Sequence, residues 1–321
     1  MGKRRKSLTE LLAEKLLLLL TAGDALTALL IGAEKSIFSA VLASLRSFSL
    51  KSGKLVSDEG NRRLMADITR NTKKVVRGVD LTDTINAFLP KFDEVDTLNE
   101  GIYKQIVGTG ATFPDSSPMK ELAIQQLISA FDDLKGLESG FEIPLRRRLF
   151  EAVTLNMELN AAVEYLRAYI VGETEAGGNL AHYGRTIAKD LLNGYTGYAD
   201  WQIAKANGLD GFYFTGPLVK NSRQTCIDMV NGSGEFEELA IEPGLFAVDD
   251  IPKIVDLAKD NKGFRPETTA ETYPIFRNGY NCEHLLVFVP LSNAEKETRA
   301  RVKEAVENGN FLDPGTDNSG S

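Results

Sequence analysis

The hydrophobic period of the chain changes at about Gly208, and this change limits the folds that it can adopt. Upstream of this glycine, apolar residues recur at helical spacing over long stretches, most clearly after Pro118. Downstream of it, short runs rich in β-branched and aromatic residues indicate strands. The pattern therefore predicts the α+β class, in which a mostly helical N-terminal two thirds is followed by a small α+β C-terminal domain with a short antiparallel sheet.

The predicted helices are rich in residues of high helix propensity and end near glycine, proline or polar clusters. They cover residues 7–45, 61–76, 83–107, the stretch after Pro118, 144–170 and 180–206. Gly23 and Gly32 are weak points in the first helix, and Leu89-Pro90 marks a break in the third. The Ser, Lys and Gly-rich residues 48–60 predict a loop.

The C-terminal part has two clear strand patterns. One is Gly211-Phe-Tyr-Phe-Thr-Gly, and the stronger one runs from His284 to Pro290. Residues 251–260 predict a short helix or turn, and residues 294–308 a charged closing helix. We therefore expect four regions: a helical oligomerisation or docking region at 1–117, a helical hairpin at 118–179, the α+β domain at 180–310 and a flexible tail at 311–321.

The N-terminus combines a basic cluster, Lys3-Arg4-Arg5-Lys6, with the leucine run from Leu16 to Leu20. The apolar stretch around that run is only about 16 residues long and contains Asp24, whereas a membrane-spanning helix needs about 20 residues with few charges. Helix packing is therefore favoured over a membrane segment. A wide apolar helix surface of this kind needs neighbours, within the chain or in an oligomer.

Charge and cysteine content exclude two classes of protein. The formal net charge of −8 argues against a general nucleic-acid binder, because neutralising phosphates requires an excess of positive charge. Local contact with DNA stays open at two basic clusters, Arg146-Arg147-Arg148 and the N-terminal residues Lys3, Arg4, Arg5 and Lys6, which would contact packaged DNA. A solvated helix face and a solvated charged terminus are the favoured interpretations. The 2 cysteines exclude a disulfide-dense scaffold and are typical of a protein made in a reducing cytosol.

Motifs of enzymes are scarce in this sequence. Gly108-Thr-Gly110 lacks the downstream glycine or lysine of a phosphate-binding loop, and no His-Glu-x-x-His motif occurs. The chain has 2 histidines, His182 and His284, and nothing local resembles a nucleophile elbow. These observations predict that the protein is not an enzyme.

One group of residues has the chemistry of a metal site. Cys226 follows the first predicted strand, and Cys282 and His284 precede the last, so adjacent strands would bring the three together. Two thiols and an imidazole are zinc ligands, and His182 would be a possible fourth. Paired Cys-x-x-Cys spacing is missing, so plain buried cysteines, or less readily a single disulfide, stay open as alternatives, and no other cofactor is expected.

Several segments resemble one known family in their order and spacing. They are Gly184-Arg-Thr-Ile-Ala-Lys, Trp201-Gln-Ile-Ala-Lys-Ala-Asn-Gly, Phe212-Tyr-Phe-Thr-Gly, Asn221-Ser-Arg-Gln-Thr-Cys226 with Asn231-Gly232, and Asn278-Gly-Tyr-Asn-Cys282. Together they resemble the phage Mu F-like head morphogenesis domain over about residues 180–292. The chain departs from the family pattern at Asn281-Cys-Glu-His, where the usual arginine and second cysteine are missing, and at Tyr273-Pro-Ile-Phe, which replaces the usual proline pair.

The resemblance implies a minor head protein of a tailed phage, made in the host cytoplasm and located in the virion near the portal or inner capsid. Its partners would be portal or other virion proteins, or further copies of the chain. The family-motif residues would be structural; they are Asn221, Arg223, Cys226, Asn231, Gly232, Asn281 and Cys282. For Arg223, the five donors of the guanidinium suit tying a loop to carbonyl or carboxylate groups.

Two other functions stay open. One is an internal protein that is ejected with the genome and contacts membrane or DNA through residues 3–31. The other is a metal-dependent hydrolase that uses Cys226, Cys282 and His284.

Overall fold

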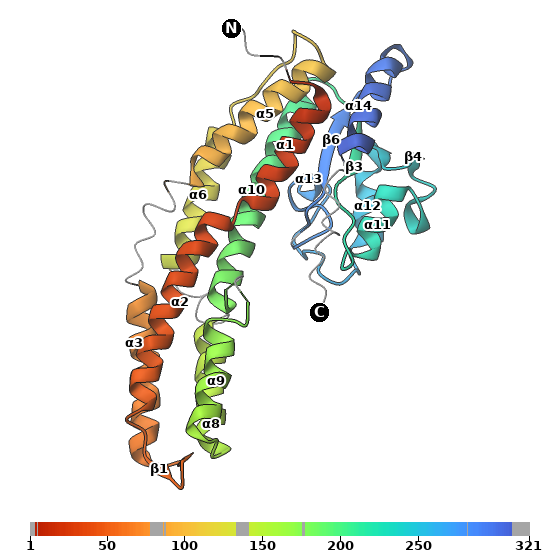
Figure 1. Cartoon of the computed structure of the whole chain (residues 1–321). Coiled ribbons are helices and arrows are strands. Elements are labelled where there is room, and N and C mark those ends of the chain that lie inside the picture. Colours follow the sequence, from red (N-terminus) through yellow and green to blue (C-terminus); the bar gives the residue numbers. More distant parts are fainter. Residues whose placement is uncertain are drawn as a thin grey trace. The chain divides into compact units, whose positions relative to one another are not determined.

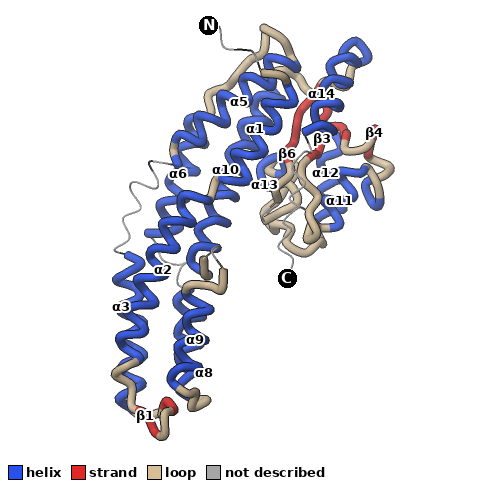
Figure 2. The backbone as a smooth tube through the Cα atoms, viewed as in Figure 1, coloured by secondary structure: helices blue, strands red, loops and turns tan. Residues whose placement is uncertain are grey.

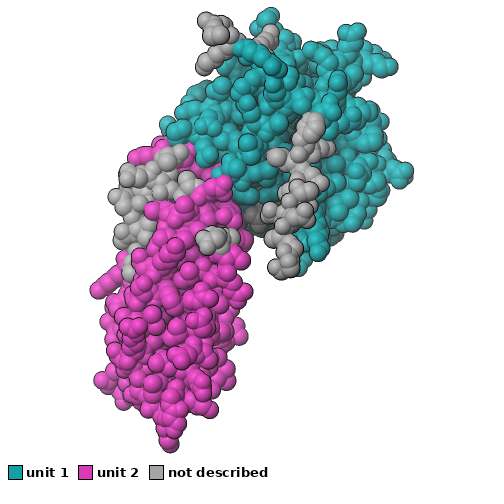
Figure 3. Space-filling model, in the orientation of Figure 1, with its two compact units in different colours: residues 1–21, 90–123, 189–321 teal, residues 22–89, 124–188 magenta. Residues whose placement is uncertain are grey.

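The computed structural model describes residues 4, 6–77, 86, 88–132, 141–174, 177–280 and 282–309. It confirms the α+β class, because helices make up most of the N-terminal part and an antiparallel sheet lies near the C-terminus (Figure 2). The chain forms two compact units (Figure 3). Unit 1 comprises residues 1–21, 90–123 and 189–321, and unit 2 comprises residues 22–89 and 124–188.

Unit 2 consists mainly of helices that bury one face against each other. Helix α2 (Asp24–Leu45) packs against α3 (Glu59–Arg77) and α9 (Leu159–Ile170), and α3 also packs against α8 (Ile143–Thr154) (Figure 1). Unit 2 also contains residues 124–132 of α6 (Ser117–Asp132) and the first part of α10. A two-stranded hairpin, formed by β1 (Leu50–Lys51) and β2 (Lys54–Leu55), belongs to it as well.

A buried carboxylate fixes the beginning of α10 (Asn179–Ala206). Glu34 of α2 has no exposed surface and accepts hydrogen bonds from the backbone N–H groups of Gly178 and Ala181, at 2.8 and 2.9 Å. The first N–H groups of a helix have no partner within the helix, and an acceptor there is stabilising. Glu34 therefore supplies from another helix the cap that α10 lacks in its own sequence.

Unit 1 combines helices with a four-stranded sheet. Helix α1 (Leu8–Thr21) packs against α5 (Pro90–Ile106) and α14 (Lys296–Gly309). The antiparallel sheet has the order β4-β5-β3-β6. Its strands are β4 (Ala240–Glu242), β5 (Leu245–Ala247), β3 (Gly211–Thr215) and β6 (Leu285–Val289).

The central strand β3 and the edge strand β6 are both buried at every position, so neighbouring elements cover both of their faces. Phe212 of β3 lies opposite Phe246 of β5 and Phe288 of β6, which forms an aromatic row on one face. Trp201 of α10 contacts Phe288 with ring centroids 5.5 Å apart. The row of rings therefore anchors α10 to this face of the sheet.

The connections between the strands contain short helices. They are α11 (Gln224–Asn231), η2 (Gly234–Phe236), η3 (Val248–Asp250), α12 (Ile251–Ala258), α13 (Tyr273–Phe276) and η4 (Asn293–Glu295). Helix α11 follows β3, and α13 precedes the segment that leads into β6. These two helices position the residues of the candidate site.

A buried ion pair ties α1 to α10. Lys15 donates to both carboxylate oxygens of Asp200 at 2.7 Å, and both side chains are almost fully buried. Tyr103 of α5 also donates a hydrogen bond to Asp200. Burial raises the pKa of Asp200 and lowers that of Lys15, while their mutual attraction acts against both shifts. The pair thus links three helices at the cost of removing two charges from water.

Several sequence-based predictions need correction. Residues 144–170 are not one helix, because α8 ends at Thr154 and α9 begins at Leu159, with Asn156 between them at a φ of 50°. The predicted loop at 48–60 contains the β1–β2 hairpin and the first residues of α3. Gly32 does not interrupt α2, whereas a break does occur at Gly23.

The predicted regions 1–117, 118–179 and 180–310 follow one another along the chain, whereas each compact unit is assembled from separate stretches. Helix α10 contributes to both units. The predicted tail, 311–321, and residues 83–85 and 87 of the third predicted helix lie outside the described residues.

We predict that Lys15→Met lowers the free energy of unfolding by about 3–5 kcal/mol, because Asp200 is left buried without its counter-charge. The loss is expected to be larger at alkaline than at acidic pH, because protonation of Asp200, whose pKa burial already raises, removes the uncompensated charge. Urea unfolding over a pH series measures both effects. Lys104→Met, which removes an exposed pair with Glu100 on α5, is the control, with a loss below about 1 kcal/mol. Equal losses in the two variants would contradict the role of the buried pair.

Candidate metal centre

Two segments far apart in the sequence form the candidate site in unit 1. The first leaves β3 at Thr215 and enters α11, so that Cys226 lies in the first turn of this helix. The second, residues 277–284, follows α13 and enters β6. Because β3 and β6 are paired, the end of one strand lies beside the start of the other, with Thr215 opposite Leu285. The pairing brings the two segments together.

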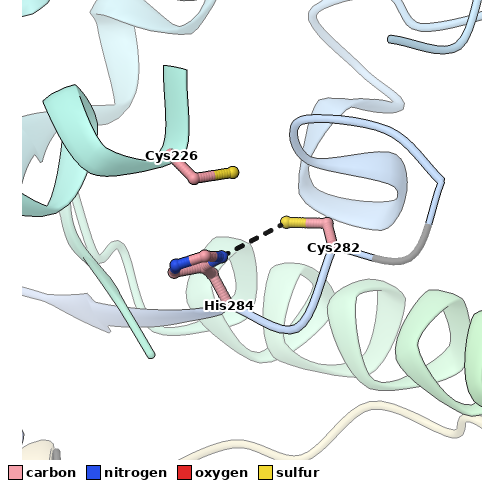
Figure 4. A group of neighbouring side chains, drawn as sticks. All are labelled: Cys226, Cys282 and His284. Atoms are coloured by element: carbon pink, nitrogen blue, oxygen red, sulfur yellow. Dashed lines mark hydrogen bonds between the residues drawn. The ribbon is translucent and has the colours of Figure 1, made fainter. Parts of the chain in front are cut away.

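The structure places Cys226, Cys282 and His284 side by side (Figure 4). Their ligand atoms, the two sulfurs and a ring nitrogen, all lie within 4.8 Å of one another. The His284 Nδ1 atom is 3.7 Å from the Cys282 Sγ atom, and all three side chains are buried. The proximity expected from strand adjacency is therefore present in the fold.

His284 has few polar contacts apart from the cysteine. Its ring stacks on Phe214 with centroids 4.9 Å apart, and its Nε2 atom has no hydrogen-bond partner among the described residues. Gly216 makes this position possible, because a Cβ atom there would lie 2.9 Å from the His284 Cα atom. The imidazole is thus held by packing in a place where a buried polar atom is costly.

A second group of buried side chains surrounds the sulfurs. The Asn278 Nδ2 group donates to the Cys226 Sγ atom at 3.6 Å and to the Met229 Sδ atom at 3.4 Å. The Tyr273 hydroxyl donates to Met229 Sδ and to Asn278 Oδ1, each at 3.2 Å. Asn278 therefore holds α11 against the segment that carries Cys282.

The two thiols influence each other. A hydrogen bond from the Cys226 thiol, together with a hydrogen bond from His284 and the charge of Arg277, lowers the pKa of Cys282. The hydrogen bond with Cys282, together with burial, raises the pKa of Cys226. Arg277 is itself buried and donates to the Asn193 carbonyl oxygen at 3.0 Å. Cys282 is therefore the thiol that ionises first.

Arg223 joins the same two segments outside the sulfur cluster. It is the residue before α11, and its guanidinium donates to the Asn278 carbonyl oxygen at 2.9 Å and to the Tyr280 carbonyl oxygen. Gly263 lies beside it, since a Cβ atom there would come within 2.9 Å of Arg223 Nη2. The planar fork of arginine suits two carbonyl groups at once, which a lysine cannot reproduce.

The remaining motif residues lie around α11. Asn221 is exposed in the turn before the helix, and Asn231 is its exposed last residue. Gly232 ends the helix with a φ of 59°, and a Cβ atom there would lie 3.0 Å from the Ala240 Cβ atom. Only glycine combines this left-handed backbone with such a close approach. Asn281 lies outside the described residues.

His182 was expected as a possible fourth ligand, but it does not belong to the cluster formed by the described residues. It is exposed on the part of α10 that belongs to unit 2. Sequence reasoning also did not assign roles to Asn278, Met229 and Tyr273. The only sequence signal for them is their position in or next to the two motif segments.

A scan against protein-family models and comparisons with characterised proteins and with solved structures find no match to this chain.

We predict that Arg223→Lys lowers the free energy of unfolding by about 1–2 kcal/mol. The single ammonium group of lysine cannot replace the two guanidinium nitrogens, so one carbonyl oxygen loses its hydrogen-bond partner. Amide hydrogen exchange is expected to speed up in residues 277–284 more than in unit 2. Arg70→Lys, at an exposed pair with Asp67, is the matched control and leaves both measurements unchanged. Unchanged exchange in residues 277–284 of the Arg223 variant would show that the two hydrogen bonds do not hold the segment.

Proposed function

We propose that the chain is a structural assembly protein of a tailed-phage virion, a minor head protein that is associated with the portal or inner capsid, and not an enzyme. One observation carries the proposal. The two motif segments that resemble the Mu F-like domain, 221–232 and 277–284, meet in the fold and are joined by Arg223 and Asn278. The two segments thus belong to one junction of the fold, as the parts of a single domain motif are expected to.

The chemistry of these residues supports a structural role. Cys226, Cys282 and His284 are each at most 5% exposed, so no substrate in solution reaches them without a change in the fold. The guanidinium N–H groups of Arg223 donate hydrogen bonds to main-chain carbonyl groups and not to a ligand in solution. A binding or assembly module needs such internal ties, whereas a catalyst needs reactive groups at an accessible surface.

Unit 2 carries exposed apolar side chains suited to contact with another virion subunit. Ile143 and Phe150 are 53% and 58% exposed and lie two turns apart on the same face of α8. Leu155, 68% exposed, follows the same helix, and Leu50, 45% exposed, belongs to the hairpin that pairs with residues 157–159. Large apolar groups gathered at one end of a helical unit are typical of protein–protein contacts.

The proposal predicts that the chain is present in purified particles in few copies relative to the major capsid protein. Quantitative mass spectrometry of gradient-purified particles, produced with the chain supplied by complementation, makes the measurement. Phe150→Glu is expected to reduce incorporation at least about tenfold, since a charge at the centre of an apolar contact costs well over 1.4 kcal/mol. Lys253→Gln, at an exposed polar position on α12 of unit 1, is the control and keeps full incorporation. Particles that lack the wild-type chain would contradict the proposed function.

A second candidate function, ejection with the genome and contact with membrane or DNA, is favoured by one observation. The stretch Leu8–Leu45 is long and apolar enough to cross a membrane by length and composition, because it contains an 18-residue window with a mean hydropathy of 2.0. However, 53% of that window is buried in the fold. The nearby basic residues are partly neutralised, because Arg4 pairs with Glu10 at 3.3 Å and Lys6 with Glu14 at 2.5 Å. Lys3 and Arg5 lie outside the described residues.

This second function predicts that the full chain floats with vesicles of anionic lipid, or shifts duplex DNA in a gel at low salt. Glu substitution of Arg4 and Lys6 together would then weaken the interaction, because fewer positive charges face the anionic surface. No association with vesicles or DNA at low salt would rule it out.

A further inference from the structure

We propose that Cys226, Cys282 and His284 bind one zinc ion, which fastens α11 to the segment that enters β6. This inference goes beyond the assembly function and does not depend on it. It starts from the donor set, because two sulfurs and an imidazole nitrogen match the preference of zinc for cysteine and histidine ligands.

The spacing of the donors fits the size of the ion. Tetrahedral zinc, with Zn–S bonds of about 2.3 Å and Zn–N bonds of about 2.0 Å, holds neighbouring ligand atoms roughly 3.5–3.8 Å apart. His284 Nδ1 and Cys282 Sγ already lie 3.7 Å apart, and no pair of ligand atoms in the cluster exceeds 4.8 Å. A rotation of the Cys226 side chain about its Cα–Cβ bond is a small adjustment of the kind needed to close the set.

The surroundings provide the outer contacts that zinc sites have. A zinc-bound thiolate usually accepts hydrogen bonds from nearby amide groups, which orient the ligand. Asn278 Nδ2 supplies such a bond to Cys226 Sγ, and Phe214 fixes the ring of His284 by stacking. Asn278 is a positioning residue in this arrangement, since it would act on the metal only through Cys226.

The ion would also give the Nδ1 atom of the buried imidazole a stronger partner, while Nε2 keeps no hydrogen-bond partner among the described residues. In the fold, the polar contact of His284 among the described residues is the long one to Cys282, and a bond from Nδ1 to zinc replaces it with a strong one. On binding, zinc takes the sulfur of each cysteine as a thiolate, and any proton on the thiols is released to solvent. Three protein ligands leave the fourth tetrahedral position for a water molecule.

Metal analysis of the full-length wild-type chain is the direct test. The chain is purified with a thiol-free reductant, incubated with zinc sulfate, dialysed and examined by plasma mass spectrometry and by thiol titration. We expect one zinc per chain, and two thiols that become reactive only after a chelator removes the metal. Reconstitution with Co²⁺ is expected to give the sulfur-to-metal charge-transfer band of thiolate ligation.

Variants locate the ion. Cys226→Ser and His284→Asn are expected to lose the equivalent of zinc, while His182→Asn, which changes the other histidine of the chain, retains it. Asn278→Ala is expected to bind zinc about 10- to 100-fold more weakly in competition with a chromogenic chelator. Circular dichroism establishes that each variant is folded.

Four results would overturn the proposal. They are wild-type chain with two free thiols and substoichiometric zinc, wild-type chain with a Cys226–Cys282 disulfide, stoichiometric copper or iron in place of zinc, and full zinc retention by a folded Cys226→Ser variant. The first three depend on the wild-type chain alone, so the proposal stays testable even if the variants do not fold. None of the four bears on incorporation into particles.

Discussion

The arrangement of unit 1 depends on the contacts that the buried carboxylate of Asp200 makes with Lys15 and Tyr103. The carboxylate accepts from Lys15 of α1 and from Tyr103 of α5, while the next residue of α10, Trp201, packs on Phe288 of the sheet. A buried charge with these partners tolerates few other arrangements, because each alternative leaves an uncompensated charge away from water. Helices α1, α5 and α10 and the sheet are thus held in one relative arrangement. One motif segment follows β3 and the other precedes β6, so the position of the sheet determines where both segments lie.

Strand pairing and hydrogen bonds between the two motif segments then form the candidate site within unit 1. Strand pairing brings the ends of β3 and β6 together, and Arg223 and Asn278 then bind α11 to the segment 277–284. The cluster of Cys226, Cys282 and His284 lies inside this junction and is buried. Its position explains why a metal there would act on the stability of the domain and not on a substrate in solution.

The sequence predicts the local structure better than the long-range contacts. The helices at 7–45, 61–76 and 180–206 and the strands that became β3 and β6 follow from propensity and period, and the meeting of Cys226, Cys282 and His284 follows from strand adjacency. The break at Asn156, the β4–β5 hairpin and α11 have no comparable signal, because tertiary contacts and a left-handed backbone decide them. The pair of Lys15 and Asp200 joins residues 185 positions apart, which no local pattern indicates.

We propose that this chain works by packing against other subunits of a virion. A particle reconstruction that resolves the head and its portal vertex tests it most directly. The account predicts density for this chain at the portal or on the inner capsid surface, with the exposed apolar face of α8 that carries Ile143 and Phe150 in contact with another subunit. Particles whose complete head and portal density leaves no place for the chain would contradict the claim.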